Sequence, residues 1–283
     1  MIPKKYFLQL IALLIFITNI NSEVGFSFSN QSVNSSGISN INETSGITAV
    51  ITYYQLPRTL QFYARDSQDS ASITFVGKLH TSGYDSVFAE VYRNNVYHKR
   101  KSVKLNYSGG VSSFTFSQKI HSELSEYKFK LYLKSGSSNS HIYTADSVVC
   151  GDAFIICGQS NSHPTDVQAT YKNEFCRSFG VQTSNYNSTA YNPADTNWGY
   201  SKADGSVYYW SGPNNVGVWG LQLQRLIKET YGIPTCIING GRASTTIEMQ
   251  KGVAVQGDLE SGVGYVIEDP KHVEWLRTVS AKD

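Results

Sequence analysis

One short segment carries residue types that can perform nucleophilic chemistry. Gly158-Gln159-Ser160-Asn161 directly follows the apolar run at 153–157. A serine at a strand-to-loop corner, next to a glycine, can expose its hydroxyl and its backbone N–H to a substrate carbonyl. By themselves, four such residues are in most chance matches an ordinary polar turn. The segment therefore makes Ser160 a candidate nucleophile that still needs a base and oxyanion donors.

Two histidines are candidates for that base. Asp269 and His272 have the Asp-x-x-His spacing that could supply a base and the residue that orients it. The structural alternative is a helix that begins after Asp269, with Pro270 in its first turn and His272 on the surface. His163 is too close in sequence to Ser160 to stand opposite its hydroxyl, so lining a pocket or capping the turn suits it better.

The elements that must position Ser160 follow a strand–helix–strand pattern. The continuous apolar run at 153–157 is typical of a strand buried on both faces. Residues 218–227 repeat apolar side chains at helical spacing before Gly232, and 235–238 form a second buried strand. This order predicts an α/β architecture, whose ligand sites lie beyond the carboxyl ends of the strands.

The preceding half of the chain has a different periodicity. Apolar and polar residues alternate through 71–79, 87–91 and 127–133, with glycine- and asparagine-containing turns between the runs. The spacing predicts an antiparallel β-sandwich over residues 50–146. The expected fold class is therefore mixed: this sandwich, then an incomplete α/β, flavodoxin-like three-layer domain over residues 147–283.

The N-terminus resembles a secretion signal. Residues 1–22 combine a basic start, an apolar stretch of signal-peptide length and a small residue before Glu23, and 23–49 form a linker of low complexity. We therefore favour cleavage over an uncleaved N-terminal anchor, and expect a secreted or cell-surface protein with no stable membrane span after cleavage. Export would permit disulfides among the four cysteines and glycosylation at five N-x-Ser/Thr sites. These sites are Asn30, Asn34, Asn42, Asn106 and Asn187.

Composition excludes several classes of function. The chain of 283 residues has a net charge of only +2 and no run of like charge, so nucleic acid is not an expected partner. The cysteine spacings match no zinc template, so no metal site is expected.

Three blocks resemble the sialate O-acetylesterase family of the SGNH hydrolases. The first block, 149–161, contains Gly-Asp, an apolar strand and Gly-Gln-Ser-Asn. In the second, 215–221, a glycine begins a helix, and the third, 233–244, is a strand that ends in a Gly-Gly corner. Their order and spacing match the family over about residues 149–248.

The resemblance implies hydrolysis of O-acetyl esters on sugars through an acyl-serine intermediate, without a cofactor. Ser160 would be the nucleophile, and the N–H groups of Ser160 and Gly217 would contribute to the oxyanion site, assisted by the helix dipole. Asn239 or Arg242 would contact the sugar, unless they are merely a turn residue and a solvated cation. Asp269 and His272 would complete the catalytic group.

The sequence also departs from the family. Its Gln-Gly-Glu-x-Asp block is missing, and the match fades after Glu248, which suggests truncation or a divergent tail. Two alternatives to an active esterase therefore stand. One is an inactive esterase-like protein that binds carbohydrate, with stacking faces offered by Tyr208, Tyr209 and Trp210. The other is a structural or surface protein in which only the sandwich folds well.

Overall fold

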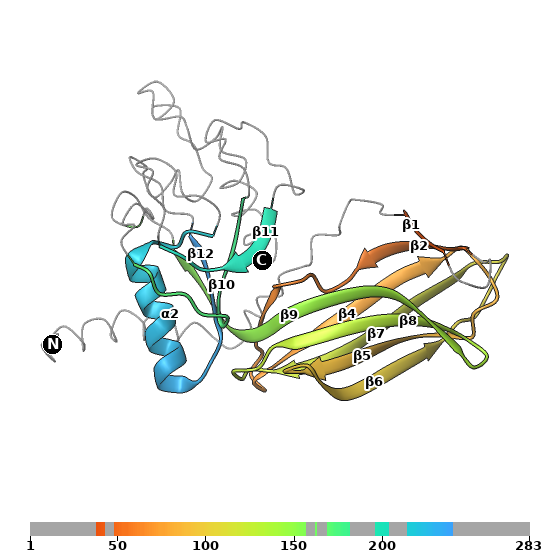
Figure 1. The fold of residues 1–283 in the computed structure, drawn as a ribbon, viewed down its shortest axis with the longest axis horizontal. Helices are drawn as coiled ribbons and strands as arrows, with labels where there is room; N and C mark the ends of the chain where they lie inside the picture. The colour runs from red at the N-terminus through yellow and green to blue at the C-terminus, as the bar shows by residue number, and fades with distance from the viewer. Residues whose placement is uncertain are drawn as a thin grey trace, which may run out of the picture.

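The computed structural model describes residues 38–42, 48–156, 162, 169–181, 196–203 and 214–239. Most of these residues lie in strands, and they include one helix, α2 (Gly217–Tyr231). Figure 1 shows an elongated pair of sheets beside a smaller group of strands that carries α2. No helix in the described part of the chain is long and apolar enough to cross a bilayer.

The smaller of two sheets has four antiparallel strands. In spatial order they are β1 (Ile38–Asn42), β2 (Thr48–Gln55), β4 (Ser70–Leu79) and β7 (Ser112–His121).

The larger sheet is mixed. In spatial order its main path is β11 (Thr196–Tyr200), β10 (Cys176–Val181), β12 (Thr235–Asn239), β9 (Ser138–Ile156), β8 (Tyr127–Ser135), β5 (Ser86–Arg93) and β6 (Val96–Lys104). The short strand β3 (Phe62–Ala64) pairs with β9 off this path.

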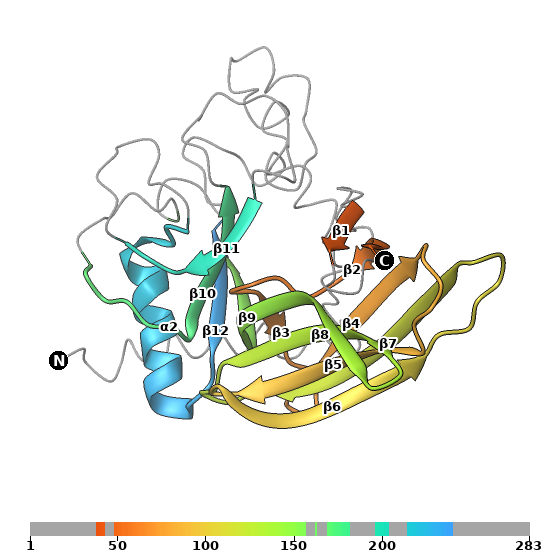
Figure 2. The same cartoon turned by 45° about the vertical axis from the view of Figure 1, so that its right-hand side comes forward.

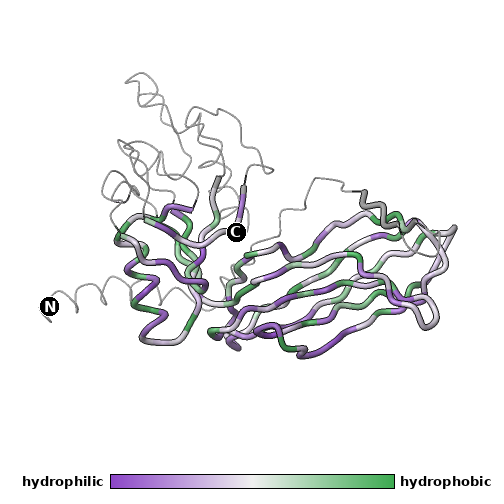
Figure 3. The backbone as a smooth tube through the Cα atoms, in the orientation of Figure 1, coloured by the Kyte–Doolittle hydropathy of each residue, from purple (hydrophilic) through white to green (hydrophobic). Residues whose placement is uncertain are grey.

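The two sheets enclose the largest hydrophobic core. Alternate residues of β4, β5, β7 and β8 point inward, as the period-two patterns predict, and Figure 3 shows the alternation along the strands. Phe75 stacks on Phe116 and contacts Phe129 across this core, with ring centroids 5.0 and 5.7 Å apart. The individual strand predictions at 71–79, 87–91 and 127–133 are confirmed.

Strand β9 connects the two parts of the molecule (Figure 2). Its first half pairs antiparallel with β8, and its last residues pair parallel with β3 and β12. Near the transition the register with β8 shifts, and Ser147 has a φ of 55°. The expected limit between residues 146 and 147 falls inside this one strand, and the division into domains stays a prediction.

The predicted fold class is wrong. The local predictions of a strand at 153–157, a helix at 218–227 and a strand at 235–238 correspond to the end of β9, to α2 and to β12. The larger sheet, however, joins three parallel strands to antiparallel neighbours on both sides, and α2 is the single helix among the described residues. A flavodoxin-like domain needs a mainly parallel sheet with helices on both faces, so the described fold is not a three-layer α/β domain.

Helix α2 packs on the parallel strands through two glycines, Leu221 and Gln224. A Cβ on Gly220 would lie 3.1 Å from the Ile156 side chain and 3.4 Å from that of Ile237, so the glycine permits a close approach. The buried amide of Gln224 donates to the carbonyls of Arg177 and Thr235 at 3.0 and 3.1 Å. These contacts fix the direction of α2 relative to β10 and β12.

Candidate functional site

The carboxyl ends of β9 and β12 meet at one edge of the larger sheet. Asn239 at the end of β12 is in register with Ile156 at the end of β9. The Gly-Gln-Ser-Asn segment begins two residues after Ile156. Ligand-binding loops usually follow the carboxyl ends of parallel strands, so this edge is the expected place for a site.

Asn239 ties three chain segments together at this edge. Its side-chain Nδ2 donates to the carbonyl oxygen of Ser162 at 3.1 Å and to that of Val216 at 3.3 Å. Ser162 follows the candidate nucleophile by two residues, and Val216 directly precedes α2. The end of β12 is thus hydrogen-bonded both to Ser162 and to the residue that precedes α2.

The N-terminus of α2 lies at the same edge. Gly217 is buried, and its φ of 75° favours glycine. Its N–H donates to the side-chain Oδ1 of Asn215 at 3.0 Å. The positive end of the helix dipole is therefore close to the strand ends, but this particular N–H already has an acceptor.

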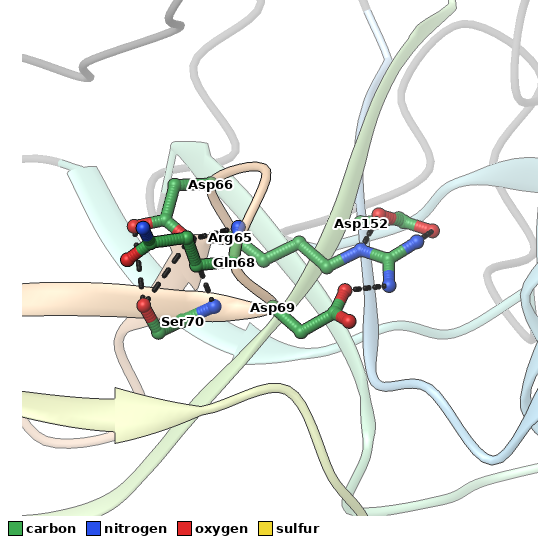
Figure 4. A network of polar contacts seen from close by, with 6 residues as sticks. All are labelled: Arg65, Asp66, Gln68, Asp69, Ser70 and Asp152. Atoms are coloured by element: carbon green, nitrogen blue, oxygen red, sulfur yellow. Dashed lines mark hydrogen bonds and ion pairs between the residues drawn. The ribbon is translucent and has the colours of Figure 1, made fainter.

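The other end of the first block is fixed by an ion pair. Arg65 donates from Nε and Nη2 to the two carboxylate oxygens of Asp152, at 2.6 and 3.0 Å, and from Nη1 to Asp69 at 2.6 Å (Figure 4). Partial burial works against the charged guanidinium, but the hydrogen bonds and charges of the two carboxylates outweigh it and raise the pKa of Arg65. The bidentate geometry holds the beginning of the parallel segment of β9 against the loop after β3.

That loop is itself closed by a carboxylate, as the left part of Figure 4 shows. One oxygen of Asp66 accepts the backbone N–H groups of Gln68 and Ser70 at 2.8 and 3.0 Å. The N–H of Gln68 contributes most to lowering the pKa of Asp66. The loop is thereby shaped so that Arg65 reaches Asp152 and Asp69 binds Arg65.

Of the predicted site residues, the structure describes Asn239 and Gly217. Asn239 contacts Val216, the residue before Gly217. Ser160, Arg242, Asp269 and His272, as well as His163, lie outside the described residues. Among the residues that the structure describes, no cluster of three or more His, Cys, Asp or Glu side chains could hold a metal ion.

Sequence reasoning missed the partner of Asp152. The Gly-Asp pair was part of the first block, but Arg65 is 87 residues away and belongs to the predicted sandwich. A single arginine in a turn has no local signal that would link it to that aspartate.

The described cysteines are buried free thiols, although export would allow disulfides. Cys150, Cys176 and Cys236 are unpaired in the structure, and Cys157 lies outside the described residues. Burial raises the pKa of Cys150 to about 12 and that of Cys176 to about 11. Neither thiol has the lowered pKa of a nucleophilic cysteine.

Comparisons with known proteins do not assign the chain to a family. No protein-family profile matches it, and no curated protein does so either. A distant structural neighbour is a carbohydrate acetylesterase from Xanthomonas citri, at 16% identity and a TM-score of 0.42; the match covers 74% of this chain but only 45% of that one.

Two further solved structures match smaller parts of the chain. A β-glucuronidase from Parabacteroides merdae is 10% identical with a TM-score of 0.25, over 34% of this chain and 13% of that one. A CARDB domain from Pyrococcus furiosus is 18% identical with a TM-score of 0.22, over 35% of this chain and 87% of that domain. These scores are too low to carry a family or an activity over to this protein.

Proposed function

We propose that the protein is a carbohydrate O-acetylesterase in which Ser160 is the nucleophile. The observation that carries the proposal is the pair of hydrogen bonds from Asn239 to the carbonyls of Ser162 and Val216. They join the segments around all three sequence blocks that resemble the sialate O-acetylesterases. The resemblance implies that these three blocks lie close together, and contacts between residues at or beside them support the proposal.

The proposed reaction is a two-step acyl transfer. The Ser160 hydroxyl attacks the acetyl carbonyl and gives its proton to a base; the sugar oxygen then leaves, takes up that proton, and acetyl-serine remains. Water, activated by the same base, hydrolyses the acetyl-serine to acetate. His272 is the proposed base, and Asp269 orients it.

The start of α2 would assist at the developing oxyanion. The helix has no acidic residue in its first turn to offset the positive end of its dipole. For the Gly217 N–H to contribute directly, the Asn215 side chain must release it, because the two are hydrogen-bonded in the structure. Asn239 and Arg242 are the proposed contacts to the sugar.

An inactive, carbohydrate-binding protein is the second candidate function. It is favoured by the same contact between Asn215 and Gly217, which occupies one of the two proposed backbone oxyanion donors.

The test is acetate release from p-nitrophenyl acetate and from an O-acetylated sugar by the purified full chain. We expect turnover by the unmodified protein and a loss of about a thousandfold or more in Ser160→Ala. Ser72→Ala, on the exposed face of β4, is the matched control and should keep full activity. Equal rates for the unmodified protein and Ser160→Ala would refute the esterase and leave the binding function.

His272→Ala tests the base separately. We expect His272→Ala to lose nearly as much activity as Ser160→Ala, because nucleophile and base act in the same step and removing either one abolishes their joint contribution. Full activity in His272→Ala would remove only the proposed base.

We also propose that the chain is exported and that residues 1–22 are removed. The support is the basic and apolar pattern of this segment. N-terminal sequencing of the protein from a secreting host should give a chain that begins at Glu23; an intact Met1 on retained protein would refute export.

A further inference from the structure

The outward face of the sandwich part of the larger sheet carries an aligned set of polar and aromatic side chains. Strand register places Ser102, Phe88, Tyr132 and His141 in one row across β6, β5, β8 and β9. The neighbouring residues on this outer face, two positions along each strand, include Ser86, Lys134 and Asn139.

A cavity of about 220 Å³ lies in this face. Its lining consists of two cations, one amide, three hydroxyls and one aromatic ring, with no carboxylate: Arg100, Lys134, Asn139, Ser86, Ser102, Ser137 and Phe88. The volume is below the roughly 300 Å³ at which pockets for drug-sized ligands begin, so a single sugar unit suits it better than a larger group.

The floor of this cavity holds Arg100 in place. Phe88 is only 3% exposed, because Tyr132 stacks on it with a centroid distance of 5.0 Å and an interplanar angle of 14°. The Arg100 guanidinium lies over the same ring, 5.1 Å from its centroid. A cation held on an aromatic face loses less freedom when it binds a ligand.

Neither cation of the cavity has an ionic partner in the described part of the chain. The salt bridges of the described residues include neither Arg100 nor Lys134. Glu90, opposite Arg100 in the strand register, accepts the hydroxyl of Tyr92 at 2.7 Å instead. Two cations that form no salt bridge among the described residues, beside hydroxyl and amide groups, complement a ligand that carries both a carboxylate and hydroxyls.

We propose that this cavity binds a carboxylate-bearing sugar residue of an acidic glycan. Arg100 and Lys134 bind the carboxylate, and Asn139 and the serine hydroxyls bind the sugar hydroxyls. The site lies on the sandwich, whereas the proposed esterase site lies at the ends of β9 and β12. Binding here therefore does not depend on ester hydrolysis, and either function can fail without the other.

Calorimetric titration of the full chain at low salt tests this site, with trigalacturonate and its fully methyl-esterified form as probes. We expect the acid form to bind and the ester to bind at least about tenfold more weakly, because esterification removes the charge. Arg100→Gln and Lys134→Gln should each weaken binding of the acid about tenfold. Lys78→Gln, the same charge change on β4 of the opposite sheet, is the matched control and should bind as the unmodified protein does.

The proposal is overturned if trigalacturonate does not bind, or if Lys78→Gln weakens its binding as much as the cavity variants do. It is also overturned if free acetate competes as strongly as the trisaccharide, or if oligothymidylate binds more tightly than trigalacturonate and this binding depends on Arg100. Ser160→Ala should bind trigalacturonate normally; lost binding in that variant would assign the sugar to the esterase site. Circular dichroism of each variant checks that the fold is retained.

Discussion

At the scale of single residues, Gly151 shows why the Gly-Asp pair of the first block has a glycine. A Cβ at this position would lie 1.8 Å from the carbonyl oxygen of Pro234, which is backbone and cannot turn aside. The same carbonyl accepts the N–H of Asp152 at 3.0 Å. The glycine therefore lets β9 approach the chain that leads into β12.

Gly151→Ala should destabilise the protein by about 3 kcal/mol or more, because the strands must separate to admit the methyl group. Gly77→Ala is the matched comparison in β4. Its Cβ would meet the ring of Phe114 at 2.4 Å, but a side chain can shift, so a smaller loss is expected. Urea denaturation of both variants measures the difference; an equal or smaller loss in Gly151→Ala would contradict the reading of this contact.

Glu123 gives a prediction about pH. Burial works to raise its pKa, but hydrogen bonds from Tyr127 and Arg93 outweigh burial and lower it. A lowered pKa in the folded state means that the carboxylate stabilises the fold above its unfolded pKa of about 4.3, and that this contribution disappears as the pH falls through the folded pKa.

Glu123→Gln should therefore cost about 1 kcal/mol at pH 7, a modest value because Arg93 is half exposed, and the difference from the unmodified protein should shrink below about pH 4. Denaturation between pH 3 and 7 checks this. Glu229→Gln breaks an exposed pair with Arg225 on α2 and is the control. The prediction is wrong if the difference in the free energy of unfolding between Glu123→Gln and the unmodified protein stays constant with pH.

Single residues could be proposed for the site from the sequence only where a pattern is local. Block patterns made Ser160, Gly217 and Asn239 candidates, and their roles stay predictions. The contacts that the structure adds, Asn239 with Ser162 and Arg65 with Asp152, join positions 77 and 87 residues apart. No spacing rule in a single sequence specifies such pairs.

At the scale of elements, Arg177 links the two parts of the molecule. It lies on β10, its side chain is fully buried, and its Nη2 donates to Glu126 at 2.8 Å and to the carbonyl of Ser147 at 2.9 Å. Tyr200 lies under the guanidinium, 4.7 Å away. Burial lowers the pKa of Arg177, and the Glu126 carboxylate opposes that effect. The arginine thus anchors the turn of β9 at Ser147 and the segment before β8.

Glu126→Gln should cost about 2–3 kcal/mol, because it leaves the buried guanidinium without a counter-charge. The double variant Arg177→Met/Glu126→Leu should be more stable than this single variant, since no buried charge remains unpaired. Guanidinium denaturation of both tests the pair. A double variant that is less stable than Glu126→Gln would show that the arginine contributes mainly by its packing and its bond to Ser147.

The elements were easier to predict than their assembly. Alternation identified the strands of the sandwich because each has one buried and one exposed face. The parallel strands and α2 were also recognised, but the same pattern suggested an α/β domain. It could not show that β9 runs on for 19 residues and pairs with antiparallel β8 in one half and with parallel β3 and β12 in the other. The spacing of apolar residues indicates which positions are buried, but it does not indicate which neighbouring strand or helix covers them.

At the scale of the whole molecule, the two proposed sites divide the work between the two parts. The proposed sugar site lies on the sandwich, and the proposed esterase site lies at the edge formed by β9, β12 and α2. Strand β9 and the ion pairs Arg177–Glu126 and Arg65–Asp152 connect the two parts. An acidic glycan held by the sandwich would raise the local concentration of its own acetyl esters near the second site.

The claim on which this account chiefly depends is that Ser160 is an activated nucleophile. Treatment of the folded full chain with a fluorophosphonate, followed by digestion and mass spectrometry, measures this directly, because the reagent phosphonylates a serine activated by a base much faster than an ordinary serine. The account predicts one adduct, on Ser160, that is absent from Ser160→Ala and from heat-denatured protein. An unlabelled chain, or an adduct on another serine with Ser160 unmodified, would contradict it.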